Sequence, residues 1–425
     1  MSRGLLYIKK RNFPEGLTCL VLILPLLLSF FIDFLHLPSF VKYLIDIAIV
    51  LILASSLLSR RVFFRAGTLP LVVLIVGFFL YTLIMYLFNY QSIVYYLWGL
   101  RNNFRFYIAF LAFILFFDQD DAGFFINLLD KIFWVNAVVS FAQFVMGYRQ
   151  DYLGGLFGVE KGCNAYSIIF FSIVIGKSLL SFMEQKENAL PCFSKCGVSL
   201  IIAAMAELKF YFVIFVLILV FSAVFTRFSW KKIAIMIILS LVIFVAGILL
   251  ADLFGSNNTL SFNRIWELVT AENYATAEDL GRFTAIPTIA KTILTKIPEQ
   301  LFGMGLGNCD TSTFAICNTP FYQSHANLHY TWFSSAFLFL ETGYFGLLAY
   351  LSFFIICFCL AWKQMRNDTA NVLFCRLSMM MALLCLLLTF YNSSLRMEVA
   401  YIAYFALALP FIKQGVREQS QSVSL

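Results

Sequence analysis

Charged residues are scarce in this chain. Only 12% of its 425 residues are Asp, Glu, Lys or Arg, whereas 61% are hydrophobic, and the mean hydropathy is +0.87. A water-soluble protein of this length could not hide so much apolar surface in one core. The scarcity of charge therefore excludes a soluble globular protein and indicates a polytopic membrane protein.

Several common functional motifs are also missing. The ten cysteines include no CxxC pair, although Cys309 and Cys317 lie in one long loop where a disulfide could form, and the three histidines belong to no HExxH pattern. The net charge of +7 comes from basic residues scattered in short loops, without the interleaved aromatic residues of a nucleic-acid patch. The apolar runs do not alternate, which excludes a β-barrel. We therefore expect no metal and no nucleic acid.

A cleavage site for a signal peptidase is missing near the N-terminus. Arg3, Lys9, Lys10 and Arg11 lead directly into a long apolar run that lacks the small residues of such a site. The first helix is therefore expected to stay as an anchor.

Long apolar runs are what the chain has in abundance, with the length of about 18 to 25 residues that a bilayer requires of a helix. We predict an all-α polytopic membrane protein, with one transmembrane domain over residues 1–425. The stretch 193–226 is also compatible with a helical hairpin broken at Glu207 and Lys209. About twelve predicted spans lie near 17–35, 40–58, 69–88, 103–117, 122–146, 164–182, 193–206, 208–226, 231–252, 331–361, 370–390 and 397–412.

The distribution of Lys and Arg sets the orientation. It predicts that both termini are cytoplasmic and that the long loop 253–330, between late helices, caps the outer face. The inner loop 118–123 is an exception because it is acidic, but acidic residues weigh little in this rule. The predicted inner basic residues are Arg60, Arg61, Arg65, Lys186, Lys195, Arg227, Lys231, Lys232, Lys363, Arg366, Lys413 and Arg417. The basic residues left on the outer face need another reason, and they are Arg101, Arg105, Arg149, Lys161, Lys209, Arg264, Arg282, Lys291, Lys296 and Arg396.

The outer loop contains GRFTAIPTIAKTILTKIPEQLFGMGLG, residues 281–307. Isoleucines at three- and four-residue steps predict an amphipathic helix over 284–297, and Pro287 is tolerable only in its first turn. Arg282 beside this helix start suits an anionic oxygen, with a solvated interface arginine as the alternative. GMGLG at 303–307 lacks the context of a phosphate cradle and predicts a tight turn where backbone passes close to backbone or ligand.

Two charge pairs interrupt the apolar runs. Arg101 and Arg105 are four residues apart, on one face of a helix, so we expect an anionic partner or a burial contact, with snorkelling to lipid phosphates as the alternative. Glu207 and Lys209 would each cost about 2.5–3.5 kcal/mol in the bilayer centre. They therefore predict either a cavity or a structural pair.

The stretch YQSHANLHYTWFSSAFLFLETGY, residues 322–344, contains two of the three histidines. His325 and His329 have a metal-ligand spacing, but either imidazole could instead take a proton from a hydroxyl group near pH 7, and an interface histidine is a third interpretation. Glu341 lies about 18 Å beyond His329 along a continuous helix. We therefore expect Glu341 to face the bundle interior as a supporting acid.

The order of these motifs resembles the bacterial O-antigen polymerase and ligase superfamily. GR at 281–282 is followed by LFGMGLG, SHANLHYTWF and FLETGYFGLLAYL, while LRNNFRFY and AELKFYF occur earlier in the chain. The resemblance covers about residues 280–350 and, more loosely, LRNNFRFY and AELKFYF, and elsewhere only the hydropathy carries it. It implies a dozen or so helices with a large periplasmic loop, in a fold similar to the GT-C-type glycosyltransferases.

The resemblance implies a metal-independent glycosyltransferase of the inner membrane that needs no cofactor and uses sugars on undecaprenyl diphosphate at the periplasmic face. Its expected partners are the lipid-linked oligosaccharide, membrane lipids and a chain-length regulator protein. His325-Ala-Asn327-Leu-His329 departs from the His-Asn pair of the ligase branch, and Glu207-Leu-Lys209 replaces its Ser-Arg-Gly stretch. An O-antigen polymerase is therefore the favoured interpretation, with the ligase, or a flippase or transporter of lipid-linked sugars, as alternatives.

Cations on the outer face would stabilise the diphosphate leaving group. The expected catalytic residues are His329, His325 and Arg282; the expected diphosphate-binding residues are Arg101, Arg105, Lys209 and Arg282; and the expected supporting residues are Glu207, Glu341 and Asn327.

Overall fold

The structure is a computed structural model that describes residues 12–58, 67–89, 91–226, 280–312, 314–367 and 371–413. Within these ranges the chain forms helices and no strand, and an isolated backbone bridge pairs Asp118 with Lys413. Seven helices are long and apolar enough to cross a membrane. They are α1 (Phe13–Leu35), α2 (Tyr43–Leu58) with the 3-10 turn before it, α3 (Leu69–Phe88), α5 (Gln119–Val145), α6 (Asn164–Met183), α14 (Ser334–Gln364) and α15 (Val372–Tyr391).

Shorter or more polar helices complete the bundle. They are α4 (Ile93–Phe116), α7 (Ala189–Met205), α8 (Lys209–Val224) and α16 (Ala400–Ala408). Each predicted span that falls in the described ranges coincides with one of these helices, whereas the predicted span 231–252 and much of the loop 253–330 lie outside them. The hairpin interpretation of 193–226 is confirmed by α7 and α8.

The predicted start of the fourth span was wrong. It was placed at 103, but α4 begins at Ile93. Arg101 and Arg105 interrupt the apolar run without ending the helix, because acidic side chains from other parts of the chain neutralise them. Local hydropathy cannot anticipate such pairing.

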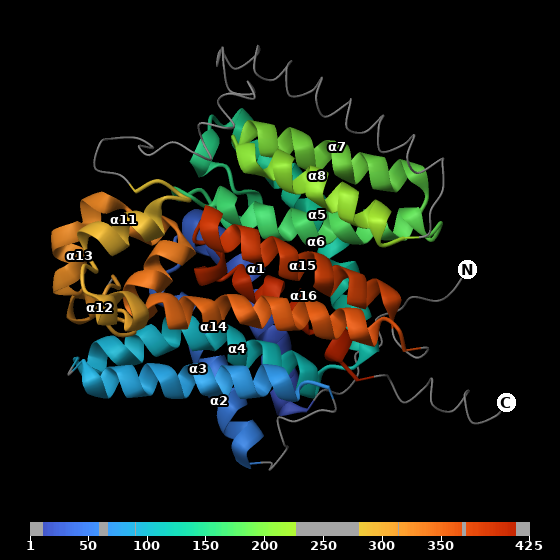
Figure 1. Cartoon of the computed structure of the whole chain (residues 1–425). Coiled ribbons are helices and arrows are strands. Elements are labelled where there is room, and N and C mark those ends of the chain that lie inside the picture. Colours follow the sequence, from blue (N-terminus) through green and yellow to red (C-terminus); the bar gives the residue numbers. More distant parts are fainter. Residues whose placement is uncertain are drawn as a thin grey trace.

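Three short helices gather at one end of the bundle, which we call the cap end (Figure 1). They are α11 (Ala285–Thr292), α12 (Ile297–Phe302) and α13 (Pro320–His325). The predicted single helix over 284–297 is therefore two helices. The first ends at Thr292, and Lys296 is extended because Pro298 can occupy only the first turn of the next helix.

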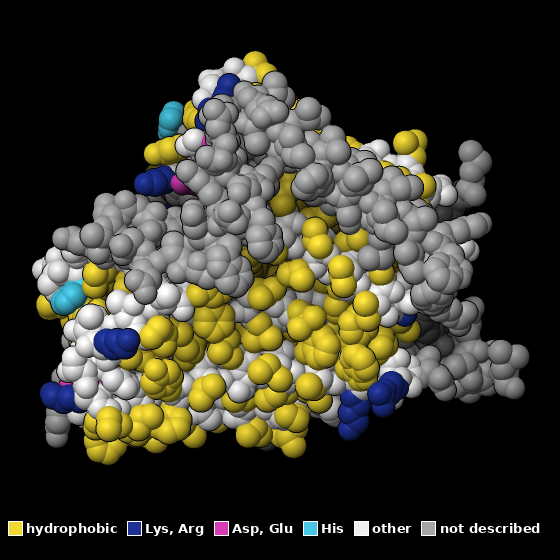
Figure 2. All heavy atoms as spheres, turned by 45° about the horizontal axis from the view of Figure 1, so that its top comes forward, with side chains coloured by type: hydrophobic (Ala, Val, Ile, Leu, Met, Phe, Trp, Pro, Cys, Tyr) yellow, Lys and Arg dark blue, Asp and Glu magenta, His cyan; other side chains and the backbone are white. Residues whose placement is uncertain are grey.

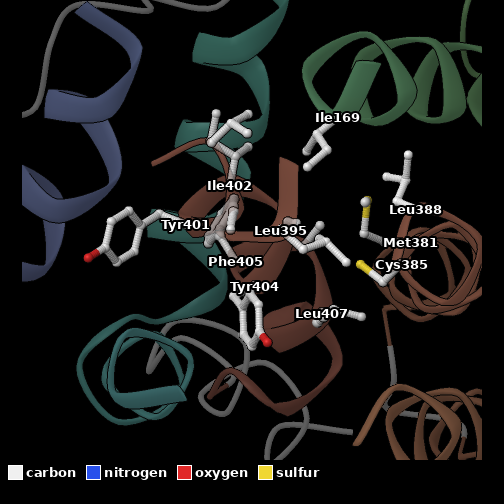
Figure 3. Packing of buried hydrophobic residues seen from close by; sticks show 14 of the residues in the cluster. Ile169, Met381, Cys385, Leu388, Leu395, Tyr401, Ile402, Tyr404, Phe405 and Leu407 are labelled. Carbon is white, nitrogen blue, oxygen red and sulfur yellow. The ribbon is translucent and has the colours of Figure 1, made fainter. Parts of the chain in front are cut away.

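The core surrounds α16, whose nine residues are all buried. This helix packs against α4, α6 and α15, and the ring centres of Tyr404 and Phe405 lie 5.7 and 5.4 Å from those of Phe106 and Phe113 of α4. Figure 3 shows side chains of α16 together with Ile169 of α6 and Met381 of α15. Small residues let helices approach closely inside a membrane bundle. Alanines occupy positions 400, 403, 406 and 408 of α16.

The surface matches the expected environment. On the face shown in Figure 2, hydrophobic side chains cover the middle, while Lys and Arg side chains lie toward its two ends. Val50 in α2, Val73 in α3 and Val138 in α5 are each at least 60% exposed. Such helix surfaces suit contact with lipid and not with water.

The end opposite the cap holds its own charged cluster. Lys195 of α7 forms ion pairs with Asp130 at 3.3 Å and Glu187 at 3.0 Å, and Lys177 also pairs with Asp130. The backbone N–H of Gln119 donates to the Lys413 carbonyl at 2.8 Å. The ion pairs join α5, α6 and α7 with the loop that holds Glu187, and the backbone hydrogen bond joins the start of α5 to Lys413.

Candidate functional site

The longest helix, α14, is broken near the cap end. Gly343 has φ of 61° and ψ of −165°, which interrupts the helix and leaves preceding carbonyls without helical donors. The segment 303–310, which we call the strap, fills this break. The N–H groups of Met304 and Gly305 donate to the carbonyls of Leu340 and Glu341, each at 2.9 Å.

The glycines of the strap allow this close contact. A Cβ at Gly307, whose φ is 88°, would lie 1.9 Å from the Tyr95 carbonyl oxygen of α4, and a Cβ at Gly303 would lie 2.5 Å from the Glu341 main chain. Gln91 donates to the Leu306 carbonyl at 2.7 Å. The prediction of a tight turn at GMGLG is confirmed, and Gly303 and Gly307 lie against protein backbone, while Gly305 lies against the side chain of Gln91.

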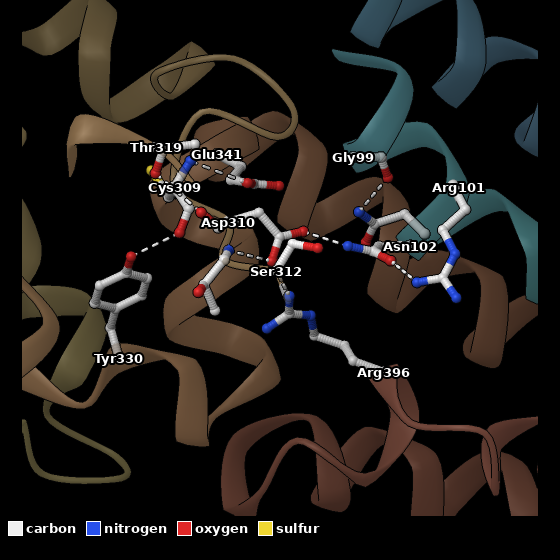
Figure 4. A network of polar contacts seen from close by, with 12 residues as sticks. Gly99, Arg101, Asn102, Cys309, Asp310, Ser312, Thr319, Tyr330, Glu341 and Arg396 are labelled. Carbon is white, nitrogen blue, oxygen red and sulfur yellow. Dashed lines mark hydrogen bonds and ion pairs between the residues drawn. The ribbon is translucent and has the colours of Figure 1, made fainter. Parts of the chain in front are cut away.

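A polar network connects the end of the strap, at Asp310, to the helices of the bundle (Figure 4). Asp310, which is 3% exposed, accepts a hydrogen bond from Asn102 at 2.5 Å and forms an ion pair with Arg396 at 3.5 Å. The Arg396 guanidinium also lies 3.1 Å from the centre of the Phe337 ring. Asp310 therefore anchors the strap to α4 and to the loop between α15 and α16.

The two arginines of α4 are neutralised by acids of this chain. Arg101 donates to Asp46 at 2.7 and 3.1 Å. Arg105, only 5% exposed, lies between Asp46 at 3.6 Å and Glu398 at 3.4 Å. The expected burial contact is present, and the anionic partners are carboxylates from α2 and from the loop before α16.

Glu398 is held in its charged form. Burial alone would raise the pKa of this carboxyl, but the Arg105 guanidinium and the hydrogen bond from the Tyr166 hydroxyl, at 2.7 Å, outweigh it, so the pKa lies below its usual value. The ion pair joins α4 to the loop before α16, and the Tyr166 hydrogen bond adds α6. Glu398 therefore holds these three elements together.

Arg282 and the α7–α8 hairpin meet at Tyr391, the last residue of α15. The Arg282 guanidinium donates to the Tyr391 carbonyl at 3.0 Å and lies 4.1 Å from the centre of its ring. Phe210 stacks on the same ring with centroids 3.7 Å apart. Lys209, which is exposed, directly precedes Phe210, so Tyr391 links Arg282 to the start of α8.

The other residue of that charge pair is also exposed. Glu207 lies in the turn between α7 and α8, has a φ of 50° and accepts a hydrogen bond from Gln150 at 2.8 Å. Because the turn is at the end of a hairpin, neither Glu207 nor Lys209 is in the middle of a membrane span. Because both residues lie at the cap end, the free-energy cost of placing a charge in the bilayer centre does not apply to them.

The two histidines have separate surroundings. His325 ends α13, stacks on Phe321 with ring centroids 4.4 Å apart and shares a 2.7 Å hydrogen bond with Ser324. His329 has a left-handed backbone, with φ of 51°, and stacks on Trp332 at 4.1 Å. His325 and His329 do not share a helix, because α13 ends at His325. Asn327, between them, is exposed.

Arg282 lies beside the segment that carries His329. The N–H of Leu280 donates to the Leu328 carbonyl at 3.4 Å, and the Arg282 guanidinium lies 5.7 Å from the centre of the Phe333 ring. The structure thus brings GR at 281–282 next to the residues on both sides of His329.

Glu341 is fully buried, as expected for a supporting residue. Its carboxylate accepts a hydrogen bond from the backbone N–H of Cys309 at 3.2 Å, and the Cys309 carbonyl accepts one from the Tyr330 hydroxyl at 2.6 Å. The chain between His329 and Glu341 is not one continuous helix, because α14 begins only at Ser334. The distance expected from a continuous helix therefore does not apply.

Both cysteines of this region are free thiols, so no disulfide joins Cys309 and Cys317. Burial, followed by the nearby charges of Glu341 and Asp310, raises the pKa of the Cys309 thiol. Burial therefore disfavours the thiolate, and the contacts of Cys309 with Glu341 and Tyr330 are made by its backbone. Among the described residues, no group of three or more His, Cys, Asp or Glu side chains is placed to hold a metal ion.

Sequence reasoning missed the acids and the tyrosines of this site. Acidic residues in or beside apolar runs are a functional signal in membrane proteins, and Asp46 and Glu398 both meet that description. Asp310, Tyr330 and Tyr391 carry no such signal, because their partners are distant in the sequence.

Comparison with known proteins adds no identity: the chain matches no model of a known protein family and no curated protein.

Proposed function

We propose that this chain is a membrane glycosyltransferase of the O-antigen polymerase kind. In this proposal the chain transfers a glycan from polyprenyl diphosphate to a hydroxyl group of a second lipid-linked repeat unit, at the periplasmic side of the inner membrane. The cap end would face the periplasm, and the apolar helices would hold both lipid-linked substrates at the same membrane surface.

One observation carries the proposal: the convergence of a cation and an imidazole at the cap end. Arg282 contacts Tyr391 and Phe333, and the hydrogen bond from Leu280 to Leu328 holds its segment against the one that carries His329. Breaking a glycosidic bond to diphosphate leaves negative charge on the leaving group, which a guanidinium stabilises. An imidazole at the same place can take the proton of the attacking hydroxyl.

The roles differ among the cations. Arg282 and Lys209 are the proposed diphosphate contacts, because Arg282 contacts Tyr391 and the exposed Lys209 begins the helix whose Phe210 stacks on the same ring. Arg101 and Arg105 are engaged by Asp46 and Glu398. Their proposed contribution is to fix the bundle beneath the site, and any contact with the diphosphate would first have to displace a carboxylate.

The test is chain extension by the purified protein in lipid nanodiscs containing defined lipid-linked repeat units. We expect the wild type to extend chains without lipid A core and Arg282→Ala to extend them about a hundredfold more slowly. Arg149→Ala is the matched control: Arg149 is an exposed arginine that donates to the Tyr148 carbonyl at 2.8 Å, and its loss should leave the rate unchanged.

Two outcomes would change the proposal. Full activity of Arg282→Ala would remove the diphosphate contact. Transfer only when lipid A core is supplied would identify the ligase reaction instead.

One observation favours a transporter as the second candidate. Discontinuous helices with a buried polar residue are common at the binding sites of secondary transporters, and α14 is broken beside the buried Glu341. Movement of labelled lipid-linked sugar between the leaflets of proteoliposomes, without chain extension, would support that candidate.

A further inference from the structure

His329 and Trp332 form one small structural unit at the cap end. The N–H of Trp332 donates to the His329 carbonyl at 3.0 Å, which closes a 3-10 turn. Side chains three residues apart are eclipsed in such a turn, so the imidazole and the indole stack, with centroids 4.1 Å apart. The indole is 40% exposed, so this pair of rings lies at the surface.

The same turn has a buried anchor. Tyr330, between the two stacked residues, is fully buried, and its ring stacks on Phe337 of α14 at 6.2 Å. Its hydroxyl donates to the Cys309 carbonyl at 2.6 Å. A buried tyrosine with a hydrogen-bonded hydroxyl fixes both the depth and the rotation of the turn that carries it.

Cys309 connects Tyr330 to the buried Glu341. Cys309 accepts the Tyr330 hydroxyl at its carbonyl and donates its N–H to Glu341 at 3.2 Å. Asp310, the next residue, is held by Asn102 and Arg396. The position of the turn is therefore set by α14, α4 and the loop before α16, through side chains far apart in the sequence.

The side chain of His325 is held differently, because its helix is tied to the strap at the opposite end, where the Thr319 hydroxyl donates to the Asp310 carbonyl at 3.0 Å. Its contacts with Phe321 and Ser324 lie within its own short helix, α13. His329 also has a left-handed backbone, which is unfavourable for a non-glycine residue and persists only where the surroundings enforce it. The fold thus fixes the placement of His329 more firmly than that of His325.

We propose that Tyr330 and Trp332 are positioning residues for His329, and that His329, not His325, is the base of the proposed transfer. Tyr330 sets the place of the turn through Cys309 and Glu341, and Trp332 sets the orientation of the imidazole by stacking. The role of His329 as a base rests on the proposed function, whereas the placement of its side chain by Tyr330 and Trp332 does not.

Placement is tested first, by the NMR signals of labelled histidine side chains in the full-length protein. The chain has only three histidines, so single substitutions assign them. We expect the His329 ring signals to shift in Tyr330→Phe and in Trp332→Ala, and to return close to wild type in Trp332→Phe, while the His325 signals stay in place. Unmoved His329 signals in both variants would overturn the proposal, whether or not the protein is a glycosyltransferase.

Activity is tested second, in the chain-extension assay. Tyr330→Phe should lower kcat by about ten- to a hundredfold with little change in KM, because a small misplacement of a reacting group costs rate more than binding. Tyr322→Phe is the control, since within the described residues its hydroxyl makes no hydrogen bond and its ring lies 6.4 Å from Tyr330.

The histidines themselves decide the assignment of the base. His329→Asn should lower the rate far more than His325→Asn. An active wild type with unchanged kcat in Tyr330→Phe, or a larger loss in His325→Asn, would overturn the assignment and leave the proposed function standing. A wild type without transfer would end the proposed function and leave the placement test valid.

Discussion

Two neighbouring segments of the cap end are held in opposite ways. The strap, 303–310, is largely buried, and its glycines press against the backbones of α4 and α14. The segment 320–333 is largely half-buried or exposed, and most of its contacts are within itself. Tyr330 is the link, since it lies in the second segment and bonds to the strap. A rigid support thus carries a more accessible segment that holds the two histidines of the proposed site.

This difference assigns distinct roles to the two segments. Reacting groups must be accessible and yet placed to within a fraction of an ångström, and these demands are met when accessible residues rest on a fixed second layer. In this protein the second layer is the break in α14, filled by the strap. Changes to the strap should therefore affect stability and activity together, and changes to the surface of 320–333 should affect activity or neither.

The largest effect is expected in the strap, at Gly307. A Cβ there would overlap the Tyr95 carbonyl, and the φ of 88° is unfavourable for alanine. Together these terms should destabilise Gly307→Ala by on the order of 3 kcal/mol, from a left-handed backbone penalty and a forced shift of α4. The measurement is the midpoint of thermal unfolding in detergent, beside the rate of chain extension.

A second glycine provides the control for this prediction. Gly197, in α7, has no positive φ, and no atom lies within 4 Å of the position that an added Cβ would take, so Gly197→Ala should be neutral or slightly stabilising. Equal midpoints for Gly307→Ala and wild type would show that the strap is not rigid.

An intermediate effect is expected at Glu398, below both segments. Because its pKa is lowered in the folded protein, the stability it contributes is present above the pKa of the unfolded chain and is lost as the pH falls through the folded pKa. Glu398→Gln should cost about 2 kcal/mol at neutral pH, as expected for a hydrogen bond to a charged group.

The pH dependence of the unfolding midpoint distinguishes the contribution of the Glu398–Arg105 ion pair from that of other acidic residues. The unfolding midpoint of the wild type should fall on acidification below the usual range of carboxyl pKa values, and this fall should be smaller in Glu398→Gln. A variant with the same acid dependence as the wild type would contradict the role of the Glu398–Arg105 pair.

The smallest effect is expected at Ser324. Its hydroxyl shares a hydrogen bond with His325 at an exposed site, so Ser324→Ala should change stability by less than about 0.5 kcal/mol and leave chain extension at its wild-type rate. A large loss of activity would show that the surroundings of His325 matter, and would weaken the distinction between the two histidines.

Some features of the site were predictable because they are local. Glycines at 303, 305 and 307 all have positive φ, as a tight turn requires, and Pro287 lies in the first turn of α11. The burial of Glu341 also followed from its place in an apolar run. The break at Gly343 was not predicted, because a single glycine in an apolar run does not reveal whether another segment will satisfy the carbonyls it releases.

The sequence by itself determined where most of the described helices lie, since backbone groups in a membrane must be satisfied within each segment and apolar runs of sufficient length allow this. It also placed GR and both histidines in one long loop. It did not determine the start of α4 or the end of α11. Only the tertiary structure decided which acids neutralise Arg101 and Arg105, that Arg282 lies beside the His329 segment, and that Tyr330 ties this segment to Glu341. These are contacts between residues far apart in the chain, and they depend on how the helices pack.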